Sequence, residues 1–392
     1  MNYILFDGSS RNNLLPLTYT KPVAEIRIGI LTIKEKWEKW LGSTTTTLTE
    51  SYLETKYPLV EMEENIMINA SCLPTEYLVE LICDLKENQA ILKDDEIIAF
   101  FTTDTQKEVD FDSYHIINYS DNIIQIKHTW DIFVYNGEAL ISDFKLITKG
   151  RKSAPIPDSV YCINKDQIFL EEGVDIEIGV LNASKGPIYI GKNAEIMEGS
   201  MIRGPFAMGE YSVVKMGTKV YGPTTLGPKC KIGGEVNNVV LSGYCSKGHE
   251  GYLGNAVIGE WCNIGADTNN SNLKNNYSEV RMWDYVKESF VKTGLQFCGL
   301  IMGDHSKSAI NTMFNTGTIV GVSSNIYGGN FQRNFVPSFS WGGSGGFKTY
   351  QIDKAEDTAE LVMNRKNEDF TKEDRQILKH VFEITKKYRN FK

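Results

Sequence analysis

The chain has 392 residues, 41% of them hydrophobic, and a formal charge of −9. Its apolar runs are shorter than the roughly eighteen residues that cross a bilayer, and its acidic balance disfavours broad nucleic-acid binding. The seven cysteines are odd in number and form no CxxC pair, which argues against a zinc site and a disulfide framework. We therefore expect a cytoplasmic protein that binds neither membranes nor nucleic acids.

The first 150 residues predict a small α/β domain. Apolar, strand-like runs at 2–6, 66–68 and 96–101 alternate with helix-like stretches at 33–41 and 75–86. A segment with two prolines, at 151–157, is the expected linker to a second domain.

The second region, at 151–345, carries an internal repeat of six residues. A glycine follows four of the first eight apolar positions, which suits a backbone corner. A period of six fits neither an α-helix nor a simple hairpin meander, so short strands stacked as a parallel β-helix are predicted from about 168 to about 329. The first eight positions are Ile190, Ile196, Ile202, Met208, Val214, Val220, Leu226 and Ile232.

The period continues on both sides of this run. Ile168, Val174 and Val180 are the expected upstream positions. Two breaks in phase, around 236–239 and at 269–298, are expected to leave the solenoid as loops. The later positions are Val240, Tyr252, Ile258, Ile264, Met302, Phe314, Val320 and Ile326, with Ser246 and Ser308 as weak members.

The last region, 346–392, predicts a helical tail that packs on the solenoid or on a neighbouring molecule. Two helices are expected, at about 353–365 and 372–389. Thr371 and Asp374 have the spacing of a capping box at the start of the second helix.

Residues 246–272 read SKGHEGYLGNAVIGEWCNIGADTNNSN. This segment resembles the acetyltransferase half of the bifunctional N-acetylglucosamine-1-phosphate uridyltransferase/glucosamine-1-phosphate acetyltransferase family, whose pattern is close to KxxHxxYLGDxxIGxxxNIGAGT. Asn255 and Asp267 depart from the pattern, and Lys247 lies one residue away from the pattern's lysine. The matching positions are His249, Tyr252, Leu253, Gly254, Ile258, Gly259, Asn263, Ile264, Gly265, Ala266, Thr268 and Asn272.

The resemblance implies a left-handed β-helix, an acetyl-CoA co-substrate and a homotrimer with the acetyl-CoA site between adjacent solenoids. A sugar amine must lose a proton as it attacks a thioester, and a histidine is suited to accept that proton. The family match gives this role to His249 and gives stabilisation of the oxyanion to the N–H of Ala266. It implies contacts to the sugar phosphate for Tyr252, Asn263 and Lys219, and it places Asn272 near the pantetheine arm.

Residues 7–30 read DGSSRNNLLPLTYTKPVAEIRIGI. They resemble the opening of the sugar nucleotidyltransferases, GxGxR...PLTxxxPKP, in which an arginine and a lysine neutralise the phosphates of a nucleoside triphosphate. Arg11 and Lys21 match these catalytic cations. Only Gly8 remains of the glycine loop. The resemblance implies Mg²⁺, but Asn69 stands where the family has an aspartate, and Asn136 is the candidate for the second metal position.

Together the two resemblances predict a bifunctional transferase that acetylates glucosamine 1-phosphate and then transfers a uridylyl group from UTP, making UDP-N-acetylglucosamine. An alternative is a nucleotidyltransferase for another sugar 1-phosphate, such as glucose 1-phosphate with dTTP, in which the solenoid is structural. A second alternative is a noncatalytic scaffold that binds sugar nucleotides.

Overall fold

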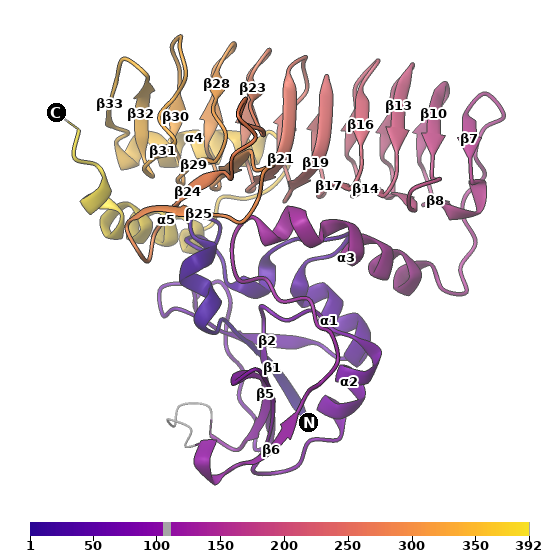
Figure 1. Cartoon of the computed structure of the whole chain (residues 1–392), viewed down its shortest axis with the longest axis vertical. Coiled ribbons are helices and arrows are strands. Elements are labelled where there is room, and N and C mark those ends of the chain that lie inside the picture. Colours follow the sequence, from indigo (N-terminus) through magenta and orange to yellow (C-terminus); the bar gives the residue numbers. More distant parts are fainter. Residues whose placement is uncertain (105–110, 392) are drawn as a thin grey trace.

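The computed structural model describes residues 1–104 and 111–391. An α/β region is followed by a left-handed parallel β-solenoid of about ten turns and by C-terminal helices, which confirms the predicted fold class. Figure 1 shows the solenoid as one long row of strands, with the N-terminal region packed against its side and the C-terminal helices near its far end.

The N-terminal region contains a six-stranded sheet in the order β2-β1-β3-β5-β4-β6. β1 pairs in parallel with β2 and β3, so the segments that follow these three strands meet at one edge. A capping box of Thr32 and Glu35 starts α1. The strands are β1 (Asn2–Phe6), β2 (Thr45–Leu48), β3 (Asn65–Asn69), β4 (Gln89–Lys93), β5 (Glu96–Thr102) and β6 (His115–Asn118); the helices are α1 (Ile33–Leu41), α2 (Glu76–Cys83) and α3 (Asp131–Thr148).

The solenoid has three faces, built from strands that pair in parallel with the strands of the coils before and after them. The first face contains β7 (Tyr161–Ile163), β10 (Gly179–Asn182), β13 (Ser200–Arg203), β16 (Lys219–Tyr221), the first halves of β19 (Glu235–Leu241) and β21 (Tyr252–Ile258), β23 (Asn269–Asn270) and β28 (Met313–Phe314). The second face contains β8 (Ile168–Leu170), β11 (Ile188–Ile190), β14 (Phe206–Met208), β17 (Thr224–Leu226), the second halves of β19 and β21, β26 (Leu300–Met302), β29 (Thr318–Val320) and β31 (Phe335–Val336). The third face contains β9 (Asp175–Ile176), β12 (Glu195–Ile196), β15 (Val213–Val214), β18 (Lys231–Ile232), β20 (Ser246–Lys247), β22 (Asn263–Ile264), β27 (Lys307–Ser308), β30 (Asn325–Ile326), β32 (Ser340–Gly343) and the antiparallel β33 (Gly346–Thr349).

All eight residues of the first hexad run, from Ile190 to Ile232, are buried in the core of the solenoid, as predicted. The register differs elsewhere. Upstream, Leu181 rather than Val180 reaches that core, and Val174 is only half-buried against it. In the same way, Leu253 replaces Tyr252, and Lys247 replaces Ser246, as the inward residue of its coil.

Val240 was predicted to point inward, and this was wrong. Val236, Val239 and Leu241 of β19 lie in the solenoid core, whereas Val240 belongs to the core shared with the N-terminal region. The expected loop at 236–239 is also absent, because β19 runs through the corner without interruption. Asn238, with φ of 54°, makes the turn inside the strand.

Within the predicted break at 269–298 the chain does leave the solenoid, but only after β23, whose Asn269 and Asn270 still pair with β28. The break carries a two-stranded hairpin, β24 (Arg281–Asp284) and β25 (Ser289–Lys292). The hairpin residues Val280, Met282 and Tyr285 pack in one core with the N-terminal region.

The C-terminal helices are α4 (Ile352–Asn364) and α5 (Lys372–Ile384), followed by a 3-10 helix, Lys386–Tyr388. The predicted capping box of Thr371 and Asp374 starts α5. α5 buries Ile377, Leu378 and Val381 in the same core as the hairpin. N-terminal region, hairpin and C-terminal helices therefore share one continuous apolar core beside the solenoid.

A buried ionic contact joins the N-terminal region to the solenoid. The Lys21 ammonium lies 3.1 Å from Asp304 Oδ2 and 2.7 Å from Glu260 Oε2, and Thr20 donates a hydrogen bond of 2.6 Å to Asp304. Burial alone would lower the pKa of Lys21, but the charges of Asp304 and Glu260 outweigh burial and raise it. Lys21 therefore stays charged at this contact.

We predict that Asp304→Ala lowers the free energy of unfolding by about 3–5 kcal/mol, because it leaves the buried Lys21 without its most buried partner. Chemical denaturation measures the loss. Lys292→Ala, which removes an exposed ion pair with Glu279, is the control and should change the same quantity by under about 1 kcal/mol. Equal effects of the two substitutions would contradict the structural role of Asp304.

Candidate functional site

His249 lies at the corner where the third face of one coil turns into the first face of the next. Ser246 pairs with Asn263 of the following coil, so Ala266 occupies the position in its coil that His249 occupies in its own. Neighbouring strands are about 4.8 Å apart, which makes the two residues neighbours. The His249 side chain is exposed to solvent.

These two corners stack tightly. The N–H of Asp267 donates a hydrogen bond of 2.8 Å to the carbonyl of Glu250, which ties one corner to the other. Gly251 has φ of 122°, and a Cβ there would lie 2.3 Å from the carbonyl oxygen of Thr268. Among the described residues, the N–H of Ala266 has no hydrogen-bond acceptor, so it can donate to a ligand beside His249.

Tyr252 and Asn272 lie together on the first face beside this corner. Asn272 Nδ2 donates to Tyr252 Oη at 2.9 Å and to Asn255 Oδ1 at 2.7 Å. Burial raises the pKa of Tyr252, and hydrogen bonds with Asn272 and Asn237 oppose that shift. The motif suggested separate roles for Tyr252 and Asn272, but the fold joins them in one amide-rich cluster with Asn255 and Asn237, which sequence reasoning had not grouped with them.

Two other predicted contacts lie farther away within the chain. Lys219 pairs in register with Glu235, and Glu235 pairs with Tyr252, so Lys219 is two coils, about 10 Å, from Tyr252. Asn263 is exposed on the third face, where it pairs with Ser246 and Lys307. A single solenoid therefore does not bring Asn263 and Lys219 onto the Tyr252 cluster.

Lys247, two residues before His249, is a buried cation inside the solenoid. Its Nζ donates to the carbonyl oxygens of Gly233 at 2.8 Å and of His249 at 3.0 Å. Burial lowers the pKa of Lys247 to about 8, although the charges of Glu250 and Asp267 act to raise it. The sequence pattern had placed Ser246, not Lys247, at the inward position.

A second candidate site surrounds Arg11, in the loop after β1. Asp7 accepts hydrogen bonds from Arg11 at 2.8 Å and from the N–H of Val23 at 2.7 Å. Arg11 also donates to the carbonyl of Thr18 at 2.7 Å and to Tyr52 Oη at 3.1 Å. Burial raises the pKa of Asp7, and the Arg11 charge opposes that shift. Asp7 was not predicted as a site residue, yet it holds the Arg11 loop in place.

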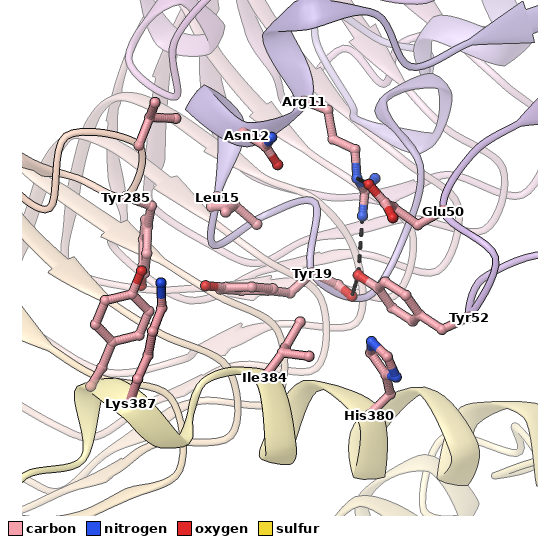
Figure 2. Close-up of a pocket in the computed structure, with 12 residues that line it drawn as sticks. Arg11, Asn12, Leu15, Tyr19, Glu50, Tyr52, Tyr285, His380, Ile384 and Lys387 are labelled. Atoms are coloured by element: carbon pink, nitrogen blue, oxygen red, sulfur yellow. Dashed lines mark hydrogen bonds and ion pairs between the residues drawn. The ribbon is translucent and has the colours of Figure 1, made fainter.

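Arg11 lines a cavity of about 410 Å³. Figure 2 shows Arg11, Glu50 and Tyr52 on one side of it, Lys387 and Tyr285 on the other, and the C-terminal helix below. The His380 ring of that helix stacks on the Tyr52 ring with centroids 4.1 Å apart. Segments far apart in the sequence, from the N-terminal region, the hairpin and the C-terminal helices, thus line this open cavity.

The other residues predicted for nucleotidyl transfer form contacts within the protein. Lys21 contacts the solenoid through Asp304 and Glu260. Asn69 Oδ1 accepts from the N–H and the hydroxyl of Ser71, at 3.0 and 2.8 Å. Asn136 Oδ1 accepts from the N–H of Gly29 at 2.8 Å and from Thr225 Oγ1 at 3.1 Å.

A Mg²⁺ ion needs oxygen ligands, preferably carboxylates. Both predicted amide oxygens are buried and engaged by protein donors. The described residues also contain no group of three or more His, Cys, Asp or Glu side chains that could hold a metal. Asn69 and Asn136 as arranged therefore do not fit a Mg²⁺ site.

A family model matches the N-terminal part of the chain, and one curated relative matches a segment of similar length. Residues 3–152 match the family described as "Sugar nucleotidyl transferase". A bifunctional sugar-1-phosphate nucleotidylyltransferase/acetyltransferase of Sulfurisphaera tokodaii is 38% identical over 149 residues. That match covers 37% of this chain and 36% of the relative, so the chain is matched over about a third of the relative's length.

Two solved structures are similar to the chain. A UDP-N-acetylglucosamine acyltransferase of Arabidopsis is 16% identical, with 54% of this chain and 82% of that chain covered and a TM-score of 0.26. The polySia-specific acetyltransferase NeuO is 15% identical, with 54% of this chain and all of that chain covered and a TM-score of 0.26.

Within the described residues, no helix combines the length and the hydropathy that a membrane crossing requires.

The pKa of Lys247 predicts how stability changes with pH. Between its folded value of about 8 and its ordinary 10.5, the unfolded chain holds a proton that the folded chain has lost. Stability therefore rises with pH through this range for the wild type, relative to Lys247→Met. Calorimetric melting of both proteins from pH 7 to pH 10 should show that the melting temperature of the wild type rises relative to that of the variant above pH 8. Parallel melting curves would contradict this titration.

Proposed function

We propose that the solenoid transfers an acetyl group from acetyl-CoA to the amine of glucosamine 1-phosphate. The observation that carries this proposal is the placement of His249 and Ala266 at equivalent positions of adjacent coils. A proton acceptor and a backbone donor without an acceptor are then next to each other, as acyl transfer to an amine requires.

The proposed reaction follows from these two groups. The amine nitrogen attacks the thioester carbonyl carbon, and His249 removes the proton that the nitrogen must lose. The N–H of Ala266 donates to the oxyanion that forms on the carbonyl oxygen. The bond between carbon and sulfur then breaks, and the CoA sulfur leaves with the proton that His249 carried. Tyr252, held by Asn272, is proposed to contact the sugar.

We propose that the active assembly is a homotrimer in the cytoplasm with acetyl-CoA bound between solenoids. Exposed apolar side chains gather on the first face and its corner, whereas α3 of the N-terminal region packs on the second face of these coils, against Phe169 and Ala207. The exposed side chains are Tyr161, Ile178, Met201, Met216 and Tyr221, each at least 42% exposed. Contact between first faces would bury this surface and would bring a neighbour's residues to the His249 corner. Asn263 and Lys219, remote from Tyr252 within one chain, would then act from a different subunit or at the rim.

For the N-terminal region we propose uridylyl transfer from UTP to the acetylated sugar phosphate. The family match over residues 3–152 and the Arg11 loop at the edge of the parallel strands support it. Arg11 would neutralise phosphate charge there. A panel of nucleoside triphosphates and sugar 1-phosphates, assayed by pyrophosphate release, tests this proposal and separates it from a nucleotidyltransferase for another sugar.

One observation favours a second candidate function, the binding of a sugar nucleotide without catalysis. Lys21, Asn69 and Asn136 all serve contacts inside the protein. Calorimetric binding of UDP-N-acetylglucosamine without pyrophosphate release from any pair would support this scaffold.

His249→Ala should lower acetylation of glucosamine 1-phosphate by roughly a hundredfold or more, because the amine loses its base. Release of the free CoA thiol measures the rate. His115→Ala, which removes another exposed histidine, is the matched control and should leave the rate unchanged. A folded His249→Ala enzyme with full activity would end this mechanism.

Arg11→Ala should abolish most pyrophosphate release and leave acetyl transfer intact, because the two sites lie in separate regions. Pyrophosphate and CoA thiol are measured on one preparation whose thermal melting shows that it is folded. Arg27→Ala, which removes another largely buried arginine that bonds the carbonyl of Ser242, controls for loss of structure. Unchanged pyrophosphate release in Arg11→Ala would rule out phosphate neutralisation by Arg11.

A further inference from the structure

One inward position of the solenoid holds a lysine where the same position of adjacent coils holds isoleucine. Lys247 pairs with Ile232, and Ile264 follows at the same place of the next coil. Lys247 is only 1% exposed. A cation therefore occupies a place where an aliphatic side chain would pack without cost.

The ammonium group of Lys247 binds backbone, not a carboxylate. Its two acceptors are the carbonyl oxygens of Gly233, in the preceding coil, and of His249, in its own coil. No carboxylate of the described residues lies within salt-bridge distance of it. The charged groups that act on it at longer range are Glu250, Asp267 and Lys219.

Burying an ammonium without an anion is unfavourable, and replacing a buried ion with an apolar residue is often stabilising. A contribution to stability therefore does not explain why a lysine occupies this inward position. The position of Lys247 does offer one specific effect, because it ties the peptide of His249 to the corner of the preceding coil. On its other side, the same corner is tied to the Ala266 corner through Asp267 and Glu250.

We propose that Lys247 is a positioning residue, whose ammonium holds the His249 corner so that the imidazole keeps a fixed place relative to the N–H of Ala266. This inference rests on the proposed acetyl transfer. Lys247 does not touch the reacting atoms, since it lies inside the solenoid and the His249 side chain lies outside.

A second lysine of the third face, half-buried and in the position that Asn263 holds in the preceding coil, provides a control. Lys307 lies on the third face two coils farther on, and its Nζ donates to the carbonyl of His305, two residues earlier in the same coil, at 2.8 Å. It does not bridge two coils. Removing its ammonium therefore removes a half-buried lysine cation from the same face without releasing the corner of His249.

The experiment compares Lys247→Met, Lys247→Gln and Lys307→Met in the full-length protein. Methionine keeps the length and apolar bulk of the lysine stem but cannot donate, whereas glutamine retains a donor without charge. We expect Lys247→Met to melt no lower than the wild type at pH 7, and to lose about tenfold to a hundredfold in kcat with an unchanged KM for acetyl-CoA. Lys247→Gln should recover part of kcat, and Lys307→Met should keep it.

Amide hydrogen exchange of the segment 248–251 gives a readout independent of activity. It should be faster in Lys247→Met than in the wild type and unchanged in Lys307→Met. Equal exchange in the wild type and Lys247→Met overturns the inference, as does faster exchange with unchanged kcat. A wild type that acetylates no amino sugar refutes the proposed function instead, and exchange then still decides whether Lys247 holds this corner.

Discussion

The strict stacking of one coil on the next is the constraint on which the solenoid and its candidate site depend. Parallel pairing fixes which residue lies over which, so a side chain at one corner has a defined neighbour in the next coil about 4.8 Å away. His249 and Ala266 are seventeen residues apart in the sequence and become neighbours only through this pairing. The tight corners at Gly251 and Gly265 permit that spacing, because a side chain at either glycine would meet the backbone of the next coil.

The contact between the two regions has consequences for the chemistry of the N-terminal one. Asp304 of the solenoid accepts hydrogen bonds from Thr20 and from the N–H of Glu260 and pairs with Lys21. Asn136 and Thr225 add a second buried polar contact. Lys21, from the KP pair that resembles a nucleotidyltransferase, and its neighbour Thr20 therefore also form the contact between the two regions. We propose that nucleotide chemistry there centres on Arg11 and on the segments that line its cavity.

The sequence predicted the features that follow from local, periodic patterns, and it missed the contacts between segments that are far apart in the chain. Eight hexad positions, the capping box of Thr371 and the break at 269–298 follow from local pattern, and the structure agrees with each. Val240 was assigned inward because an apolar residue suits either a solenoid core or an interface, and sequence alone does not separate them. Lys247 was missed because hydropathy excludes a charged residue from a core, whereas two backbone carbonyls accept it here. The partnership of Tyr252 with Asn272 needed the register of two adjacent coils. The predicted roles of the site residues remain predictions.

The shared core of the N-terminal region, the hairpin and α5 also bears on how this chain came to be built. Residues from before 150, from 280–301 and from beyond 370 pack in a single apolar cluster. Recombination at the linker would therefore separate residues that pack together. Val240, Met282 and Val381 would lose the apolar side chains of the N-terminal region that cover them. A substitution in one half that reaches this shared core therefore also changes the packing of the other half. The two halves are expected to have diverged together, as one heritable unit, rather than as parts exchanged between unrelated chains.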